Sequence, residues 1–461
     1  MTCINSEMSG LPKDRLQMHH LNFLAVAMTI LAASAALAQP AGSAERLPVG
    51  HHLGDAPLNL ENLEQLALQY NPTLVQAGAQ VRISRGQAFQ AGLPFNPQVG
   101  YVADQIGING TAGEMQGMFI EQEIVTGHKL QLSRAKFVQE AREAELLAMV
   151  QQYRVLYSVR IAYYDVLVRR MRWDLRKENR KNAADAVTTV EELVNVGQAN
   201  QPDKLQAQVE SQRAKANLQL AELEYKATWE ELAAVVGAPE LRETALEGKL
   251  DFANAPRMDR EAALSNLLAC SPELRAAEAE VARDRIGLQR ERAEPIPNVT
   301  VRGQTGYNFD TNNTVAGMQL GLRLPVFDKN QGTIMQAQAE LTRAQAELSR
   351  IELKLRQRFA RTFAEYDSAM LMAKSYHDEI LPKSQGAYRL YFDSFQQKRA
   401  AWPQVLDSQR QYYQLYENYL NNLLEARRAE AQIATFFVGE GLDEPSTPTP
   451  AGHRDSTPKP R

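Results

Sequence analysis

The sequence contains little cysteine and little net charge. Cys3 and Cys270 are the only cysteines among 461 residues, which excludes a fold held together by several disulfides, so stability must come from packing. The formal net charge is −4, which leaves no basic surface of the kind that nucleic-acid-binding proteins present. We therefore expect no nucleic acid among the partners.

Motifs of catalytic chemistry are also missing. The chain contains no G-x-x-x-x-G-K-[ST], G-x-G-x-x-G, H-E-x-x-H or G-x-S-x-G pattern. The adjacent His51 and His52 are expected to be solvated, and His128 and His377 have no partners at metal-ligand spacing. We expect no enzymatic activity, no cofactor and no metal site.

Long apolar runs are rare, and the only one extends from Leu21 to Ala38. Basic residues precede it, and it ends in a small-x-small cleavage pattern, which predicts that residues 1–38 are a secretory signal peptide followed by an extension over 39–56. An uncleaved membrane anchor is the alternative, because the run is just long enough to cross a bilayer core of ~30 Å. Met1 and Met18 are both candidate translation starts.

Glycine and proline are absent from two long segments, Lys129–Val196 and Thr333–Leu381. The first would extend roughly 100 Å as one helix. On the second, small and apolar residues form two seams, one repeating every seven residues (Ala339, Ala346, Leu353, Ala360) and one every three or four (Leu341, Ala344, Leu348, Ile351, Leu355). Two seams on one helix imply a neighbour on each side, which favours a closed ring of helices.

What the sequence does contain is the same unit written twice, about 200 residues apart. Asn71-Pro72-Thr73-Leu74 recurs as Ser271-Pro272-Glu273-Leu274, and Gly117-Met118 recurs as Gly317-Met318. Proline and glycine landmarks carry this argument because they mark structural boundaries. We predict two structural repeats.

The first repeat is expected over 57–255 and the second over 256–440. In each, a short helix (60–92 and 259–293) precedes a β-hairpin (98–125 and 297–325) and a helical hairpin (129–237 and 332–438). The proline-rich tail, 441–461, is expected to be disordered.

The strand-like segments alternate between apolar and polar residues. In the second hairpin the apolar set, taken as candidate lipid-facing residues, is Met318, Leu320, Leu322 and Leu324. Strands of ~10 residues with this alternation are typical of membrane β-barrels, although a half-buried soluble hairpin is the alternative. Four strands cannot close a barrel, and open edges cannot lie in lipid, so membrane strands would require several chains to share one barrel.

Four segments carry a family resemblance: the helical turns at 196–207 and 399–410, and the strand-to-helix passages at 123–129 and 324–329. Together with the order of elements, they resemble the TolC family of outer membrane efflux proteins over residues 57–440. The resemblance covers nearly all of the chain that follows the signal peptide, and the cation-efflux branch is the most similar.

The resemblance implies a mainly α-helical fold with a β-barrel portion. Three chains would form a homotrimer with a twelve-stranded barrel in outer membrane lipid and a long α-helical barrel in the periplasm. It also implies a passive exit duct of a tripartite efflux system, with a periplasmic adaptor (membrane fusion) protein and an inner membrane pump as partners.

By the same resemblance, the two proline-marked turns form the periplasmic tip. Asp203 and Asp407 are the candidates for a pore constriction, and each stands where the other repeat has a glutamine, Gln404 or Gln206. A role for Asp203 as a helix N-terminal carboxylate is the alternative. The candidate adaptor-contact residues are Gly197, Pro202, Arg399, Trp402 and Pro403.

Two other functions remain open. The outer membrane component of type I protein secretion has the same architecture, and the exported substrate could be a metal ion, a drug or a protein. A periplasmic coiled-coil adaptor or scaffold belongs to another class, but adaptors have one helical hairpin between small β domains, whereas this chain has two hairpins and membrane-like strands.

Overall fold

The computed structural model describes residues 57–104, 114–248, 250 and 258–448. The predicted signal peptide, the N-terminal extension and the histidines at 51 and 52 lie outside these residues. The described part belongs to one compact unit, Asp55–Arg461. Its elements are α1 (Leu60–Tyr70), α2 (Pro72–Gln90), β1 (Gln98–Asp104), β2 (Met115–Ile124), α3 (Lys129–Asn195), α4 (Gln201–Val236), α5 (Arg260–Cys270), α6 (Pro272–Ala293), β3 (Val299–Asn308), β4 (Asn313–Leu322), α7 (Gln331–Ser375), the π-helix η3 (Tyr376–Ile380), α8 (Leu381–Gln396) and α9 (Trp402–Ala434).

The same order of elements occurs in both halves, which confirms the predicted fold class. Within each repeat the short helix predicted before the strands is instead two helices, broken at Asn71-Pro72 and at Ser271-Pro272. Proline favours the first position of a helix and cannot continue one. Asn71 stabilises the new start because its side chain accepts a 3.0 Å hydrogen bond from the backbone N–H of Thr73.

The long helices carry the fold. Helix α3 has 67 residues, which corresponds to roughly 100 Å. The second long helix continues past Leu381, where the sequence predicts its end, because η3 absorbs Pro382: the backbone N–H of Leu381 bonds to the carbonyl of Tyr376, five residues back. A wider turn of this kind tolerates the missing N–H of proline, so the helical rod extends to Gln396.

The four strands form one antiparallel sheet in the order β1-β2-β3-β4, and the β2–β3 pair joins the two repeats. The register brings the apolar alternation of all four strands to one face, for example by pairing Val99 with Ile120 and Val301 with Leu320. The opposite face carries polar residues such as Arg302, which lies 4.0 Å from the ring centre of Phe119. The sheet therefore has one apolar and one polar face.

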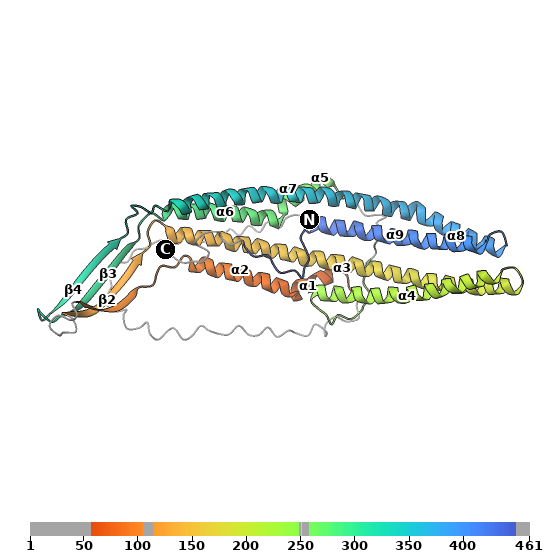
Figure 1. The fold of residues 1–461 in the computed structure, drawn as a ribbon, viewed down its shortest axis with the longest axis horizontal. Coiled ribbons are helices and arrows are strands. Elements are labelled where there is room, and N and C mark those ends of the chain that lie inside the picture. Colours follow the sequence, from red (N-terminus) through yellow and green to blue (C-terminus); the bar gives the residue numbers. More distant parts are fainter. Residues whose placement is uncertain (1–56, 105–113, 249, 251–257, 449–461) are drawn as a thin grey trace. The chain divides into compact units, whose positions relative to one another are not determined.

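The helices form a layer in which each contacts the next (Figure 1). Near the sheet the order is α2-α3-α6-α7, and near the helical turns it is α4-α3-α9-α8. Of the two seams predicted on α7, the one that contains Ala344 and Leu355 is buried against neighbouring helices. The other, represented by Leu353 at 67% exposure, has no helix on it within the described residues.

In the described part of the chain, no helix combines the length and the apolar character that a membrane crossing requires.

The segment after the last helix differs from the predicted disordered tail. Gly441 is held against α3: its carbonyl accepts hydrogen bonds from Thr73 Oγ1 at 3.0 Å and Gln151 Nε2 at 2.9 Å, and its N–H donates to Ser158 Oγ at 2.8 Å. Gln151 is 1% exposed, and the segment supplies a second acceptor for its amide, which also donates to Thr73 Oγ1 at 2.9 Å. Residues 441–448 are therefore ordered by buried polar groups, and 449–461 lie outside the described residues.

The helical turn in each repeat ends α3 or α8 with a residue in the left-handed region. Gly197 has φ +72°, and the equivalent residue of the second repeat is Lys398, with φ +60°. Both turns then make the same bond, from Gln198 N to the Leu193 carbonyl (2.6 Å) and from Arg399 N to the Ser394 carbonyl (2.8 Å).

Gly197→Ala should destabilise the protein by about 1–2 kcal/mol, because only glycine adopts this conformation without strain. No atom lies within 4 Å of the added Cβ, so the effect would be conformational rather than steric. Lys398→Gly should stabilise it by up to about 1 kcal/mol, with Lys398→Ala as the control for loss of the side chain. Thermal unfolding followed by the helical circular dichroism signal measures both changes. A shift of the same sign in Gly197→Ala and Lys398→Gly would contradict the assignment of both residues to the left-handed region.

Candidate functional site: the helical turns and the strand surface

The first helical turn is a capped glycine turn that joins α3 to α4. The Asn200 side chain accepts a hydrogen bond from the Asp203 N–H at 2.9 Å, and an Asp203 carboxylate oxygen accepts one from the Asn200 N–H at 3.4 Å. This reciprocal pair is a capping box, and Pro202 occupies the second position of the helix. The Asp203 carboxylate is therefore engaged by the backbone and half-buried.

The second turn joins α8 to α9 and keeps one of these two hydrogen bonds without an acid, because its N-cap residue Ala401 has no side-chain acceptor. Gln404 Oε1 accepts from the Ala401 N–H at 3.0 Å, as Asp203 does in the first repeat. Asp407 lies one helical turn further along α9 and is exposed, as is Gln206 at the equivalent place on α4. The two acids thus occupy different structural positions, and only Asp203 caps a helix.

Trp402 does not lie at the surface, which corrects its selection as an adaptor-contact residue. Its side chain is 2% exposed and packs at 5.1 Å between ring centres on Phe395. The surrounding buried cluster draws on α3, α4, α8 and α9 (Ala186, Val190, Ala207, Phe395, Val405, Leu406). The bulky residue at this turn therefore fixes the two hairpins to each other, whereas the other four candidate residues are exposed.

A groove, called here the tip groove, separates the first turns of α4 and α9. It is lined by Leu205, Gln206, Val209, Pro403, Leu406, Asp407 and Arg410. Leu205 and Val209 are 60% and 58% exposed, so the floor of this groove is apolar. Arg410 at its rim forms an ion pair with Glu210 at 2.8 Å. The tip groove thus offers an apolar strip bordered by one acid and one base.

Polar contacts join the two helical hairpins between the tip and the middle of the helices. Glu417 on α9 forms an ion pair with Arg172 at 3.0 Å and accepts a hydrogen bond from Arg176 at 2.8 Å, both on α3. Further pairs between the same helices are Asn179–Gln409 (3.2 Å), Asn182–Tyr413 (3.2 Å) and Asp165–Arg428 (2.8 Å). Burial raises the pKa of the Tyr413 hydroxyl, so it stays protonated at neutral pH. Sequence reasoning missed these residues, because polar side chains on a long helix are usually solvated.

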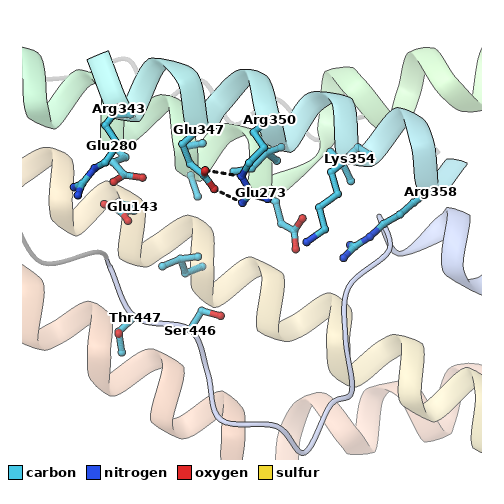
Figure 2. A pocket seen from close by; sticks show the side chains of 16 residues that line it. Glu143, Glu273, Glu280, Arg343, Glu347, Arg350, Lys354, Arg358, Ser446 and Thr447 are labelled. Atoms are coloured by element: carbon cyan, nitrogen blue, oxygen red, sulfur yellow. Dashed lines mark hydrogen bonds and ion pairs between the residues drawn. The ribbon is translucent and has the colours of Figure 1, made fainter. Parts of the chain in front are cut away.

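A charged cavity lies between α3, α6, α7 and the 441–448 segment (Figure 2). Arg343, Arg350, Lys354 and Arg358 from α7 face Glu273 and Glu280 from α6. Glu347 pairs with Arg350 on the same helix. Burial raises the pKa of the Glu273 carboxyl, against the opposing effect of Arg358.

The other carboxylates at this cavity are engaged by a buried arginine. Arg283 is 1% exposed and contacts the cavity-lining Glu143 at 3.1 Å and Glu280 at 3.4 Å, and also Asp284 at 2.9 Å. Burial alone would lower the pKa of its guanidinium, but Asp284 and Glu143 raise it. Among the described residues no group of three or more His, Cys, Asp or Glu side chains could hold a metal ion.

The strand surface is strongly apolar. Met318, Leu320, Leu322 and Leu324 are 72%, 64%, 55% and 70% exposed, and Val99, Tyr101, Met118 and Ile120 of the first repeat continue the same face. A soluble protein rarely leaves so contiguous an apolar face uncovered.

A unit that occurs twice, a β-hairpin followed by a very long helical hairpin, defines the class of protein as an outer membrane channel. A family model for outer membrane efflux proteins matches residues 63–238 and 263–437, that is, both repeats, and the chain belongs to this family. Members are passive channels rather than enzymes, located in the outer membrane with a helical portion in the periplasm.

Individual relatives agree with this assignment. The chain is 24% identical over 410 residues to the cobalt-zinc-cadmium resistance protein CzcC of Cupriavidus metallidurans, an alignment that covers 89% of this chain and 97% of CzcC. The structure of the outer-membrane channel OprN matches with a TM-score of 0.70 at 17% identity, covering 83% of this chain and 91% of OprN. The outer membrane protein VceC from Vibrio cholerae matches with a TM-score of 0.68 at 17% identity, covering 82% of this chain and 96% of VceC.

Glu417→Ala should destabilise the protein by roughly 1–3 kcal/mol, because it leaves Arg172 and Arg176, which are 17% and 26% exposed, without their shared carboxylate. Glu365→Ala is the matched control: it removes an ion pair with Arg361 in which the side chains are 52% and 84% exposed, and the cost should stay within ~0.5 kcal/mol. Thermal unfolding of the two variants in detergent makes the comparison. A Glu417 variant as stable as the control would mean that these contacts do not hold the hairpins together.

Proposed function

We propose that three copies of this chain form the exit duct of a tripartite efflux system, which docks onto a periplasmic adaptor protein and an inner membrane pump. The observation that carries the proposal is that the sheet and the helical layer of one chain both have open edges on their two sides. Strands β1 and β4 each have one strand neighbour among the described residues. Open strand edges are not tolerated in lipid, so strands of further copies must cover them.

The helices have matching open edges. Exposed apolar side chains concentrate on the helices at the two borders of the layer: Val75, Ile83 and Phe89 on α2, Leu205, Val209, Leu220 and Leu223 on α4, and Met335, Leu353 and Leu371 on α7. Copies related by rotation would pair α7 and its continuation α8 of one with α2 and α4 of the next. Such a heterologous contact closes into a ring, and three copies of four strands give a twelve-stranded barrel.

The proposed cargo rests on the similarity of this chain to a relative alone. CzcC is described as a cobalt-zinc-cadmium resistance protein, which favours divalent cations as the exported substrate. A role in type I protein secretion is the second candidate, since a wide passive duct contacts its cargo little. The genes beside this one separate the two, because an adaptor with a cation pump supports efflux and an exporter with a secreted protein supports secretion.

Leu320→Arg should prevent recovery of the trimer from outer membranes, because a charge that faces lipid inside the apolar band costs up to roughly 2–4 kcal/mol in each copy. Gln319→Arg, at the adjacent position on the polar face of β4, should assemble normally. Native mass measurement in detergent compares both variants with the wild type, which should be a trimer. A monomeric wild type would contradict the proposed assembly, and equal losses in both variants would mean that the faces have been misread.

The helical turns are the proposed periplasmic tip. Three copies of Asp203 and Asp407 would place six carboxylates around the opening, which favours the passage of cations. The capping role of Asp203 complicates an alanine substitution, since losing a cap costs about 0.5–2 kcal/mol. Gln404 in the second repeat makes the same bond without a charge. Glutamine is therefore the better replacement.

Asp203→Gln combined with Asp407→Gln should raise the single-channel conductance and weaken cation preference in planar bilayers, because both changes remove a negative charge. Each change introduces the residue that the other repeat carries at the equivalent position. Arg399→Ala should instead weaken adaptor binding and leave conductance unchanged, because its exposed side chain lies on the turn. Wild-type conductance and selectivity in the double variant would mean that the two acids act only within their helices.

A further inference from the structure

The four strands contain a single basic side chain, Arg302 on β3. The register places it on the polar face of the sheet, where its partners are Glu121 on β2 and Gln319 on β4. Gln98 on β1 completes this row of residues, called here the charged row, because it pairs with Glu121. The charged row therefore holds one base and one acid side by side.

The charged row borders an uncharged part of the polar face. Toward the turn between β3 and β4, the next two rows contain Gly100, Phe119, Gln304 and Gly317, and then Val102, Gly117, Gly306 and Val315. Asp104 lies beyond them, at the end of β1. In the other direction, the carboxylate of Glu123 accepts a hydrogen bond from Asn298 Nδ2 at 2.8 Å. The charge at the level of the charged row is therefore set by Arg302 and Glu121.

The guanidinium of Arg302 lies on an aromatic ring rather than on the carboxylate opposite. Its central carbon is 4.0 Å from the ring centre of Phe119, the diagonal neighbour on β2. No ion pair joins Arg302 to Glu121 in the described part of the chain, and the buried Nε of Arg302 has no hydrogen-bond partner there. A cation–π contact and an exposed ion pair stabilise by similar amounts, so the local geometry decides between them.

A glycine provides this geometry. Gly100 pairs with Phe119, and a Cβ at Gly100 would lie 2.6 Å from Phe119 Cε1 and 2.7 Å from Cζ. The ring therefore covers the space that a side chain at this position would occupy, which is how aromatic residues pack across strand glycines. Phe119 lies flat on the sheet as a result, and Arg302 is held close to the sheet on top of it.

We propose that Arg302 is a specificity-determining residue for ion passage through the strand end of the duct, with Phe119 as the residue that positions it. The inference rests on the proposed trimer, in which the polar face of the sheet lines the lumen of the shared barrel. Three copies would repeat the charged row around that lumen. Three guanidinium groups would then cancel the charge of the three Glu121 carboxylates at the same level.

This balance makes the two ends of the proposed duct unlike. The tip carries the carboxylates of Asp203 and Asp407, which attract cations. A fixed negative charge in the barrel would also raise the local concentration of cations and retain them there. Arg302 removes that charge, so exported cations leave the barrel more readily than they enter it from outside. Because the guanidinium lies against the sheet, it does this without narrowing the lumen.

The test measures ion currents through the full-length protein in planar bilayers at roughly 0.01 M ionic strength, where the Debye length is about 30 Å. Arg302→Gln should raise the cation-to-anion permeability ratio about twofold and reduce the rectification of the current, because the barrel then carries negative charge as the tip does. Glu121→Gln should lower the ratio by a similar factor, because it removes the acid of the same level. Arg302→Lys keeps the charge and should keep the wild-type ratio.

Phe119→Leu removes the ring without a change of charge. The released Arg302 side chains should extend into the lumen and lower the single-channel conductance, with the permeability ratio unchanged. Phe119→Leu combined with Arg302→Gln should conduct like Arg302→Gln alone, because no arginine is left to release. A Phe119→Leu channel with wild-type conductance would contradict the positioning role of the ring.

Native mass measurement establishes that each variant assembles before currents are compared. If Arg302→Gln does not assemble, Glu121→Gln decides alone, because it predicts the opposite shift from the same level. Wild-type permeability ratios in the assembled variants of both residues would overturn the inference and leave the proposed duct intact. A wild-type protein that forms no ion-conducting channel would refute the proposed function itself.

Discussion

The structure depends on backbone hydrogen bonds that the chain cannot complete alone. A four-stranded sheet leaves the outer N–H and C=O groups of β1 and β4 without strand partners among the described residues. The lipid core contains no water that could form these hydrogen bonds instead. The helical layer has the same property, since apolar side chains on α2, α4 and α7 lie exposed along its two borders. In the proposed assembly, one chain is therefore a segment of a ring. The long helices extend the same arrangement from the strands to the helical turns over roughly 100 Å.

The two repeats solve the same structural problems with different residues. Gly197 and Lys398 both end a helix at positive φ, and Asp203 and Gln404 both accept a backbone N–H as part of a cap. Helix α3 is continuous, whereas its counterpart contains a π-helical turn before Pro382. The passage into the second long helix is longer and projects Phe327. Each copy thus presents two unlike units, so a ring of three copies alternates between them.

Much of the fold could be predicted from the sequence because its signals are local. Proline and glycine mark the repeat, their absence marks the long helices, and period-two alternation marks the strands. The sequence predicts one short helix in each repeat where the structure has two, separated at Asn71-Pro72 and at Ser271-Pro272. The candidate site was harder. Sequence position places Asp203 and Trp402 on the turns, but only packing shows that Trp402 is 2% exposed and that the Asp203 carboxylate accepts a backbone hydrogen bond.

The sequence by itself determined the duplication, the first long helix and the apolar faces of the strands, since each depends on the spacing of residues along one chain. Only the tertiary structure decided which polar residues meet. Glu417 and Arg172 are 245 residues apart in the sequence, Gln409 and Asn179 are 230 apart, and no periodicity relates the members of either pair. Their contacts arise because α9 packs against α3, and the buried surface of that interface leaves no water to replace a missing partner. The same reasoning applies to residues 441–448, where Gly441 contacts Thr73, Gln151 and Ser158 through hydrogen bonds that the composition of the segment does not predict.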